Sequence, residues 1–263
     1  MKIIHVIIVF FILFSQCIFV AQTLAEEHSI TYALGDGDWH PFVYKDENGI
    51  CGYEGLFIEI LYEIFTNRMK MNLHCNGLPW KRAQGYVEEG KADFLLTVPT
   101  ERRLEYSIQS DEPLFQLYMH VYTYKDHEKL EEIKNIKNAE DILRLGLIPV
   151  SNRGNGWHEE NIDSYGIKTH YIREDEHIVK FLAAKRADII IDAVIPLNYY
   201  IKKLGLVSEI ELTDVKFGPV DFHLLLSKKS NYIELMSEFN EVIKTLKDDG
   251  TLDKMANKYM TLE

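Results

Sequence analysis

Cysteine is scarce in this sequence, with three residues among 263, at positions 17, 51 and 75. So few cysteines cannot hold together a fold that depends on a framework of disulfides. Cys17 lies within an apolar N-terminal run, which leaves Cys51 and Cys75 for the rest of the chain. Two alternatives stay open for this pair: a single disulfide, or two separate buried thiols, which we favour.

Positive charge is also in short supply. The chain has 29 Lys and Arg against 41 Asp and Glu, a formal net charge of −12 at pH 7. The first 25 residues contain Lys2 and no acidic residue, so removing them leaves a charge of −13. Because a protein of this charge repels phosphate backbones, we expect no nucleic-acid partner.

Complete catalytic motifs are missing as well. Residues 85–91 begin like a phosphate-binding loop, but Ala92 stands where a metal-binding Ser or Thr is required. His40 takes the place of the third glycine in a dinucleotide fingerprint, and His158 lacks the second histidine of a zinc-binding helix. No Gly-x-Ser-x-Gly elbow occurs. The sequence therefore offers no positive case for an enzyme, and we expect no cofactor and no metal.

The N-terminus has the features of an export signal. Lys2 precedes an almost unbroken apolar run over residues 3–20, and small residues at 23–25 form a cleavage site. The alternative is a membrane anchor, since the run is about the minimum length that spans a bilayer. No later segment is long and apolar enough to cross one. We predict a signal peptide over residues 1–25, cleavage after Ala25, and a secreted, periplasmic product.

Strand-like and helix-like segments alternate along the remaining chain in two series. In the first series, the expected strands are residues 30–34, 71–74 and 93–97, and the expected helices are 56–65 and 80–89. In the second, the expected strands are residues 121–124, 145–148, 168–172, 188–192 and 222–226, and the expected helices are 138–144, 174–185, 197–204, 233–249 and a last one after Thr251. Residues 125–137 are charged, and we expect an exposed loop there.

This order predicts an α/β fold in which helices cover the sheets. No linker rich in Pro, Gly or Ser separates the two series, which favours two lobes joined by crossing strands. We predict that residues 26–118 and 221–263 form the first lobe and residues 119–220 the second. Ligands in such sheets bind in the crevice beyond the carboxyl ends of the strands.

Seven short motifs follow one another along the chain. They are residues 39–44 (Trp-His-Pro-Phe-Val-Tyr), 49–53, 78–83 (Leu-Pro-Trp-Lys-Arg-Ala), 90–93 (Gly-Lys-Ala-Asp), 99–103 (Pro-Thr-Glu-Arg-Arg), 185–188 (Lys-Arg-Ala-Asp) and 246–252 (Leu-Lys-Asp-Asp-Gly-Thr-Leu). Together they resemble the extracellular solute-binding proteins of family 3, the periplasmic receptors of polar amino-acid importers, and the Pro-Trp-Lys-Arg-Ala motif is similar to that of one subgroup. The resemblance implies a periplasmic binding protein-like fold of type II, with two α/β lobes, two hinge strands and a ligand clamped between the lobes.

The resemblance also implies which residues contact the ligand. In that family an arginine holds the ligand's carboxylate, an acidic group holds its ammonium, and aromatic rings cover its body. Arg103, three residues after Thr100, stands in the arginine's place, and Arg102 is the competing candidate. The nearest match to the family's acidic group is Asp192. It follows Asp188 by four residues, whereas the corresponding spacing in the family is five. On a strand, an offset of one residue turns a side chain to the opposite face of the sheet. The predicted ligand contacts are Arg103, Thr100, Tyr53, Trp39, Trp80, Ser151, Asp192 and Trp157.

The aromatic members of this set have a second interpretation. Trp39 and Tyr53 suit either a stacking ring over the ligand or a ring packed in the core. Trp80 either lines the cleft or supports it from behind. Trp157 follows a Gly-rich stretch and is either a lid of the second lobe or the buried anchor of a turn.

We therefore predict a periplasmic solute-binding protein, a monomer, that captures a small polar ligand for an importer. The ligand would be an amino acid or a related carboxylate, and the partner a membrane permease on a separate chain. Hinge closure would bury the ligand and present a new surface to that partner. Two rivals stay open: a ligand-sensing module for a membrane receptor, and a dehydratase or lyase that uses Glu54, Glu59 or Asp192 as acid or base.

Overall fold

The computed structural model describes residues 28–260, so the predicted signal peptide lies outside the described residues. The strands are β1 (Ser29–Gly35), β2 (Tyr44–Ile50), β3 (Tyr53–Glu54), β4 (Asn72–Leu78), β5 (Phe94–Thr97), β6 (Ser107–Gln109), β7 (Phe115–Tyr124), β8 (Pro149–Asn152), β9 (His170–Ile172), β10 (Ile189–Ala193) and β11 (Ile210–Ser227). The α-helices are α2 (Leu56–Tyr62), α3 (Trp80–Glu89), α4 (Glu101–Tyr106), α5 (Leu130–Ile133), α6 (Ala139–Leu145), α7 (Gly156–Asn161), α8 (Asp175–Ala183), α9 (Val194–Lys203), α10 (Met236–Asp248) and α11 (Thr251–Met260). A π-helix, η1 (Glu63–Arg68), and two 3₁₀ turns, η2 (Asp163–Tyr165) and η3 (Ile233–Leu235), complete the set. Over residues 28–260, none of these helices is long and apolar enough to span a membrane.

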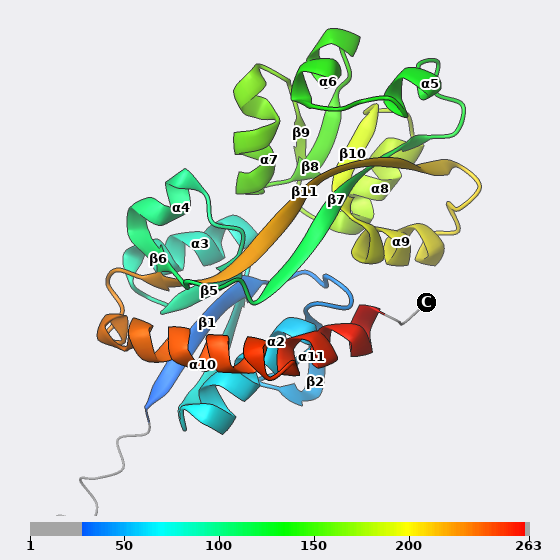
Figure 1. The fold of residues 1–263 in the computed structure, drawn as a ribbon. Coiled ribbons are helices and arrows are strands. Elements are labelled where there is room, and N and C mark those ends of the chain that lie inside the picture. The colour runs from blue at the N-terminus through cyan, green and yellow to red at the C-terminus, as the bar shows by residue number, and fades with distance from the viewer. Residues whose placement is uncertain (1–27, 261–263) are drawn as a thin grey trace, which may run out of the picture.

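Two long strands connect two smaller sheets. The strand order is β4-β1-β5-β11-β7-β10-β8-β9, with β6 also pairing with β11. β1 runs parallel to β4 and β5, and β8 runs parallel to β9 and β10. β11 is antiparallel to both β5 and β7, and β7 is antiparallel to β10. Figure 1 shows β7 and β11 side by side as they pass from one group of elements to the other.

These groups are the two α/β lobes that the sequence predicts. The first lobe holds β1, β4 and β5 with helices α2, α3, α4, α10 and α11, and the second holds β8, β9 and β10 with helices α6 to α9 (Figure 1). The β7–β11 ladder changes register between Phe217 and Val220, around Gly218, whose φ of +119° favours glycine. The boundaries at residues 118/119 and 220/221 stay a prediction.

The C-terminal helices belong to the core of the first lobe. Phe239, Ile243 and Leu246 recur on one face of α10 and are completely buried. The Phe239 ring packs edge-on against Phe65, with ring centroids 5.4 Å apart. Helix α11 lies against α2, so segments from the two ends of the described chain complete one hydrophobic core.

Local signals explain where several helices begin and end. Helix α3 ends at Gly90 in the left-handed conformation, as predicted. Helix α6 begins after the Asn138 side chain, which caps it, and ends at Gly146. The strand predicted over residues 145–148 is therefore wrong, because this segment holds the helix end and its cap, and β8 begins only at Pro149. The loop predicted over 125–137 is also partly wrong, since α5 forms within it and buries Ile133.

The two cysteines of the described chain form a disulfide. Cys51 lies in the turn between β2 and β3, and Cys75 lies on β4, with their Cα atoms 5.5 Å apart. The separate thiols that the sequence analysis favours are thus wrong. The pairing depends on the β2–β3 hairpin folding over β4, which local sequence patterns do not reveal.

Candidate ligand-binding site

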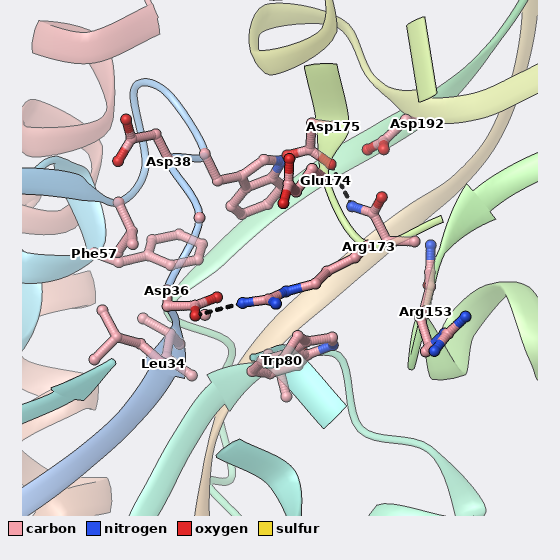
Figure 2. A pocket seen from close by; sticks show the side chains of 18 of the residues that line it. Leu34, Asp36, Asp38, Phe57, Trp80, Arg153, Arg173, Glu174, Asp175 and Asp192 are labelled. Atoms are coloured by element: carbon pink, nitrogen blue, oxygen red, sulfur yellow. Dashed lines mark hydrogen bonds and ion pairs between the residues drawn. The ribbon is translucent and has the colours of Figure 1, made fainter. Parts of the chain in front are cut away.

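A cavity of about 590 Å³ lies between the two lobes. The first lobe contributes the segment that follows β1, the start of α3 and the residues after β5. The second contributes the end of β8, the loop after it, the start of α8 and the end of β10. Most of these are carboxyl ends of parallel strands, where ligands of such sheets are expected. Figure 2 shows charged side chains from both lobes pointing into this space.

Arg103 is a buried cation at the cavity wall, with 3% of its surface exposed. Its Nη1 donates to the Val98 carbonyl at 2.6 Å and its Nε donates to Gln84 Oε1 at 3.1 Å. None of its described partners is a carboxylate, and burial lowers the pKa of the guanidinium to about 10, so it stays charged at neutral pH. Arg102, in contrast, is exposed and paired with Glu88 and Glu105. Of these two neighbouring arginines, Arg103 is therefore the one that lines the cavity.

One carbonyl of the second lobe receives three hydrogen bonds from the first. Trp80 Nε1, Gln84 Nε2 and Arg103 Nη2 donate to the oxygen of Gly154 at 2.9, 3.0 and 3.2 Å. Nearby, a Cβ atom on Gly156 would lie 3.3 Å from the Arg103 guanidinium carbon. The lobes therefore touch closely at this edge of the cavity, and the absence of a side chain at Gly154 and at Gly156 permits the contact.

Further contacts join the lobes across the other side of the cavity. Arg173 Nη2 lies 2.8 Å from Asp36 Oδ2 in an ion pair that Figure 2 shows spanning the space. The Tyr200 hydroxyl donates to the Asp38 carbonyl at 2.5 Å. Both sides of the cavity are thus bridged, which is the arrangement expected of closed lobes.

Two carboxylates of the second lobe lie in the cavity wall without a cationic partner. Asp175 accepts a hydrogen bond from Asn152, and Asp192 Oδ1 accepts one from the backbone N–H of Ala193 at 2.7 Å. Among the described residues, no Lys, Arg or His nitrogen makes an ion pair with either carboxylate. Burial raises the pKa of Asp175 to about 6, and burial together with the nearby Asp175 raises the pKa of Asp192 to about 7.

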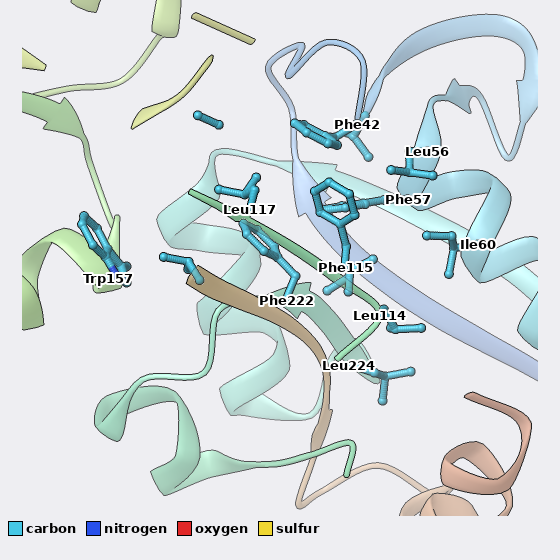
Figure 3. Packing of buried hydrophobic residues seen from close by; sticks show 14 of the residues in the cluster. Phe42, Leu56, Phe57, Ile60, Leu114, Phe115, Leu117, Trp157, Phe222 and Leu224 are labelled. Atoms are coloured by element: carbon cyan, nitrogen blue, oxygen red, sulfur yellow. The ribbon is translucent and has the colours of Figure 1, made fainter. Parts of the chain in front are cut away.

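Aromatic rings form the less polar part of the wall. Trp39 lines the cavity and also packs on Phe42 and Phe222, with centroids 4.5 and 5.7 Å away. Trp157, which belongs to the second lobe, lies opposite Phe222 and is 8% exposed (Figure 3). Trp80 lines the cavity with its ring 5.4 Å from the Arg103 guanidinium. Each tryptophan thus both lines the cavity and supports its wall.

The structure brings together five of the eight predicted ligand contacts. Those that line the cavity are Trp39, Trp80, Arg103, Trp157 and Asp192. Thr100 caps α4 instead, accepting a hydrogen bond from the Arg103 N–H, and Ser151 is buried and bonded to Asn155. Tyr53 is buried against Gly77 of β4. The ligand roles of all eight residues stay predictions.

Several cavity residues escape the sequence analysis. They are polar residues just beyond or at the ends of strands, such as Asp36 after β1 and Asn152 at the end of β8. Asp175, which begins α8, and Tyr200 on α9 are further examples. A search of the residues that follow each predicted strand would have found Asp36, but not Asn152, because the strand predicted over residues 145–148 ends before β8 begins.

The acid–base candidates of the enzyme rival are not gathered at one place. Glu59 Oε1 accepts from Tyr259 at 2.6 Å and Glu54 accepts from Tyr44 at 3.1 Å, and neither lines the cavity. Only Asp192 of the three lies there. Over residues 28–260, no group of His, Cys, Asp and Glu side chains is arranged to hold a metal ion.

A polar and aromatic cavity enclosed between two α/β lobes that share two crossing strands is the arrangement of a solute-binding protein. The model of the bacterial extracellular solute-binding proteins, family 3, matches residues 33–262, and the chain belongs to this family.

The chain is also similar to two relatives in sequence and to a solved structure in fold. The chain is 24% identical over 238 residues to the probable amino-acid-binding protein YxeM of Bacillus subtilis, covering 89% of this chain and 85% of that protein. It is 25% identical over 233 residues to the arginine-binding extracellular protein ArtP of Bacillus subtilis, covering 86% and 84%. A histidine kinase sensor domain with similarity to periplasmic binding proteins superposes with a TM-score of 0.72 at 19% identity, over 90% of this chain and 98% of that one.

Proposed function

We propose that this chain captures an amino acid between its lobes, holds the carboxylate at Arg103, and delivers the ligand unchanged to the membrane permease of an importer. The observation that carries the proposal is a buried guanidinium at the cavity wall with no carboxylate partner among the described residues. A desolvated cation of this kind is strongly stabilised by a ligand carboxylate. The names of both curated relatives refer to amino-acid binding.

The present contacts of Arg103 suggest how capture is coupled to lobe movement. Its five N–H groups make four hydrogen bonds, to Gln84, Thr97, Val98 and Gly154. A carboxylate that takes two N–H groups must therefore displace one acceptor. The Gly154 carbonyl belongs to the opposite lobe, so it is the acceptor that moves away when the lobes open.

A thermal-shift screen over amino acids, amines and small carboxylates tests the proposal. A ligand at 100 times its Kd stabilises the folded state by about 2.7 kcal/mol, so the correct compound raises the melting temperature. If no amino acid raises it, the proposal fails. Mass spectrometry of the bound compound after prolonged incubation tests for conversion, and a chemically altered ligand would favour the enzyme rival.

Export and domain organisation complete the proposal. We expect a mature periplasmic monomer that starts at Glu26, with lobes formed by residues 26–118 plus 221–263 and by 119–220. N-terminal sequencing of the exported protein and light scattering test these points. A lipid on Cys17, an uncleaved N-terminus or a stable dimer would contradict them.

A sensing role is the second candidate function. It is favoured by the similarity in fold to a histidine kinase sensor domain. The genes beside this one distinguish the two roles, because an adjacent permease and ATPase support import, whereas an adjacent membrane receptor kinase supports sensing.

A further inference from the structure

The charges in the cavity wall do not balance. Five basic side chains line it, namely Lys45, Arg103, Arg153, Arg173 and Lys203, against six acidic ones, namely Asp36, Asp38, Glu174, Asp175, Glu176 and Asp192. Three of them have cationic or histidine partners, in the pairs Asp36–Arg173, Glu174–His177 and Glu176–Lys180, at 2.8, 3.1 and 2.5 Å. Asp38 accepts a hydrogen bond from the Lys45 N–H in an exposed setting. Asp175 and Asp192 are left as partly buried carboxylates that form no ion pair with a described residue.

A third acceptor joins these two carboxylates. Asn152, at the end of β8, uses its NH₂ group to bond Asp175, while its Oδ1 is buried and has no hydrogen-bond partner. Asn152, Asp175 and Asp192 come from three different elements and all line the cavity. Buried oxygen acceptors are rarely left unsatisfied, so this cluster calls for a donor from outside the chain.

The other groups around the cluster do not supply that donor. The Tyr200 hydroxyl on α9 donates to Asp38, and the Tyr122 hydroxyl on β7 donates to Asn198. His120 is paired with Asp192 across the β7–β10 ladder, but no nitrogen of its ring makes an ion pair with the carboxylate. The two tyrosine hydroxyls are therefore engaged elsewhere, and the ring of His120, whose buried Nδ1 has no hydrogen-bond partner in the described part of the chain, makes no ion pair with either carboxylate.

We infer that Asn152, Asp175 and Asp192 form a cation subsite, and that the preferred ligand is an amino acid with a net positive charge. The inference rests on the proposed function, because Arg103 must take the ligand's carboxylate. One unpaired buried cation and two unpaired, partly buried carboxylates are neutralised together by a ligand with one carboxylate and two cationic groups. A neutral amino acid has only one cationic group and leaves one carboxylate that must bind a proton instead.

The protonation of the pair gives the inference a second readout. Because the pKa values of Asp175 and Asp192 are raised to about 6 and about 7, both carboxyls are largely protonated at pH 5 in the ligand-free protein. A cationic ligand binds the ionised forms, so binding at pH 5 must expel protons, whereas binding at pH 8 does not. The affinity for a cationic amino acid is expected to rise at least tenfold from pH 5 to pH 8.

Two pairs of probes test the inference by calorimetric titration at pH 8. L-Arginine and L-citrulline differ in the charge of a similar side chain, and so do L-lysine and L-norleucine. The charged member of at least one pair is expected to bind ten or more times more tightly than its uncharged partner. Asp175→Asn and Asp192→Asn are each expected to reduce this binding at least tenfold. Glu140→Gln removes the same charge from an exposed position on α6 that does not line the cavity, and is expected to change this binding less than twofold.

The outcomes separate this inference from the proposed function. If citrulline, norleucine or L-glutamate binds as tightly as the cationic probes, the cation subsite is wrong while amino-acid capture stands. The same holds if the affinity for arginine or lysine does not change between pH 5 and pH 8, a measurement that needs no variant. If none of these amino acids binds, the proposed function fails and the cation subsite fails with it. Melting curves of each variant confirm that it is folded.

Discussion

At the scale of single residues, the cavity is characterised by charges that the chain itself does not neutralise. Arg103 is held by neutral oxygen acceptors, and Asp175 and Asp192 by an amide and a backbone N–H. Charges that are wholly or partly withdrawn from water without a partner of opposite charge cost free energy in the ligand-free protein. A ligand of complementary charge recovers that cost, so the same side chains that weaken the empty protein provide affinity and selectivity.

Replacement of Arg103 tests the carboxylate site. Arg103→Ala is expected to weaken amino-acid binding by about 2–5 kcal/mol, or roughly 30-fold to several thousand-fold. Arg103→Lys is expected to lose most of the affinity too, because an ammonium group cannot donate two parallel hydrogen bonds to a carboxylate as the planar guanidinium does. Calorimetric titration with the best ligand of the screen provides the measurement.

Arg102→Ala is the matched control, since Arg102 is exposed and pairs with Glu88 and Glu105. It is expected to bind like the parent. A folded Arg103→Ala protein with undiminished affinity would exclude the carboxylate assignment.

The raised pKa of Asp192 predicts how the folding stability of the ligand-free protein depends on pH. Its pKa in the folded state, about 7, is higher than the unfolded value, so the folded state binds more protons between about pH 4 and 7. The contribution of this group to folding stability therefore falls as the pH rises through that window. Asp192→Asn removes the unpaired charge and is expected to stabilise the ligand-free protein at pH 8 by about 1–3 kcal/mol, but not at pH 5.

Urea unfolding of the parent and the Asp192→Asn variant at the two pH values measures this effect. A variant that is equally or less stable than the parent at pH 8 would contradict it. A gain in stability together with lost affinity is the trade-off expected of a binding residue.

At the scale of elements, close packing between α4 and the start of α7 depends on glycine. A Cβ atom at position 156 would lie 3.1 Å from Thr100 Cγ2 and 3.3 Å from the Arg103 guanidinium. Gly156→Ala is therefore expected to push the lobes apart at this edge and weaken ligand binding by about 1 kcal/mol, or roughly fivefold.

Gly85→Ala is the matched control for this substitution. Gly85 lies within α3, and a Cβ atom there meets no atom within 4 Å. The substitution is expected to leave affinity unchanged and to raise stability by about 0.5–1 kcal/mol, because alanine favours the helix. Titration and urea unfolding of both variants check the pair, and equal affinities for Gly156→Ala and the parent would refute the close-contact argument.

The Cys51–Cys75 disulfide fastens the β2–β3 hairpin to β4 and closes a loop with a sequence separation of 24. In the chain-entropy model a loop of this size contributes about 3 kcal/mol by restricting the unfolded state. Cys51→Ala combined with Cys75→Ala is thus expected to lower the free energy of unfolding by about that amount. Urea unfolding measures this change. Unfolding the parent with and without a reductant shows whether the effect belongs to the disulfide.

At the scale of the whole molecule, the two lobes are connected through β7 and β11 and held together by contacts across the cavity. A fold of this kind suits capture and release, because a hinge in two strands lets each lobe move as a unit. Each lobe contributes one wall of the cavity. Arg103 of the first lobe therefore faces the same space as Asp175 and Asp192 of the second only when the lobes are closed.

Much of this organisation was predictable from the sequence. The β-α alternation, the spaced motifs from residue 39 to 252, the end of α3 at Gly90 and the choice of Arg103 all follow from local patterns or from a family resemblance. Periodicity, capping and glycine at helix ends act over a few residues, so they can be read without knowing the fold.

The partners of the cavity residues were decided by tertiary structure alone. Asp36 and Arg173 are 137 positions apart, and Arg103 meets Gly154 across 51. The Cys51–Cys75 bond, the burial of Tyr53 and the cluster of Asp175 with Asp192 likewise depend on how distant elements pack. Contacts of this range are set by the burial of whole helix and sheet faces, and no short stretch of sequence specifies them.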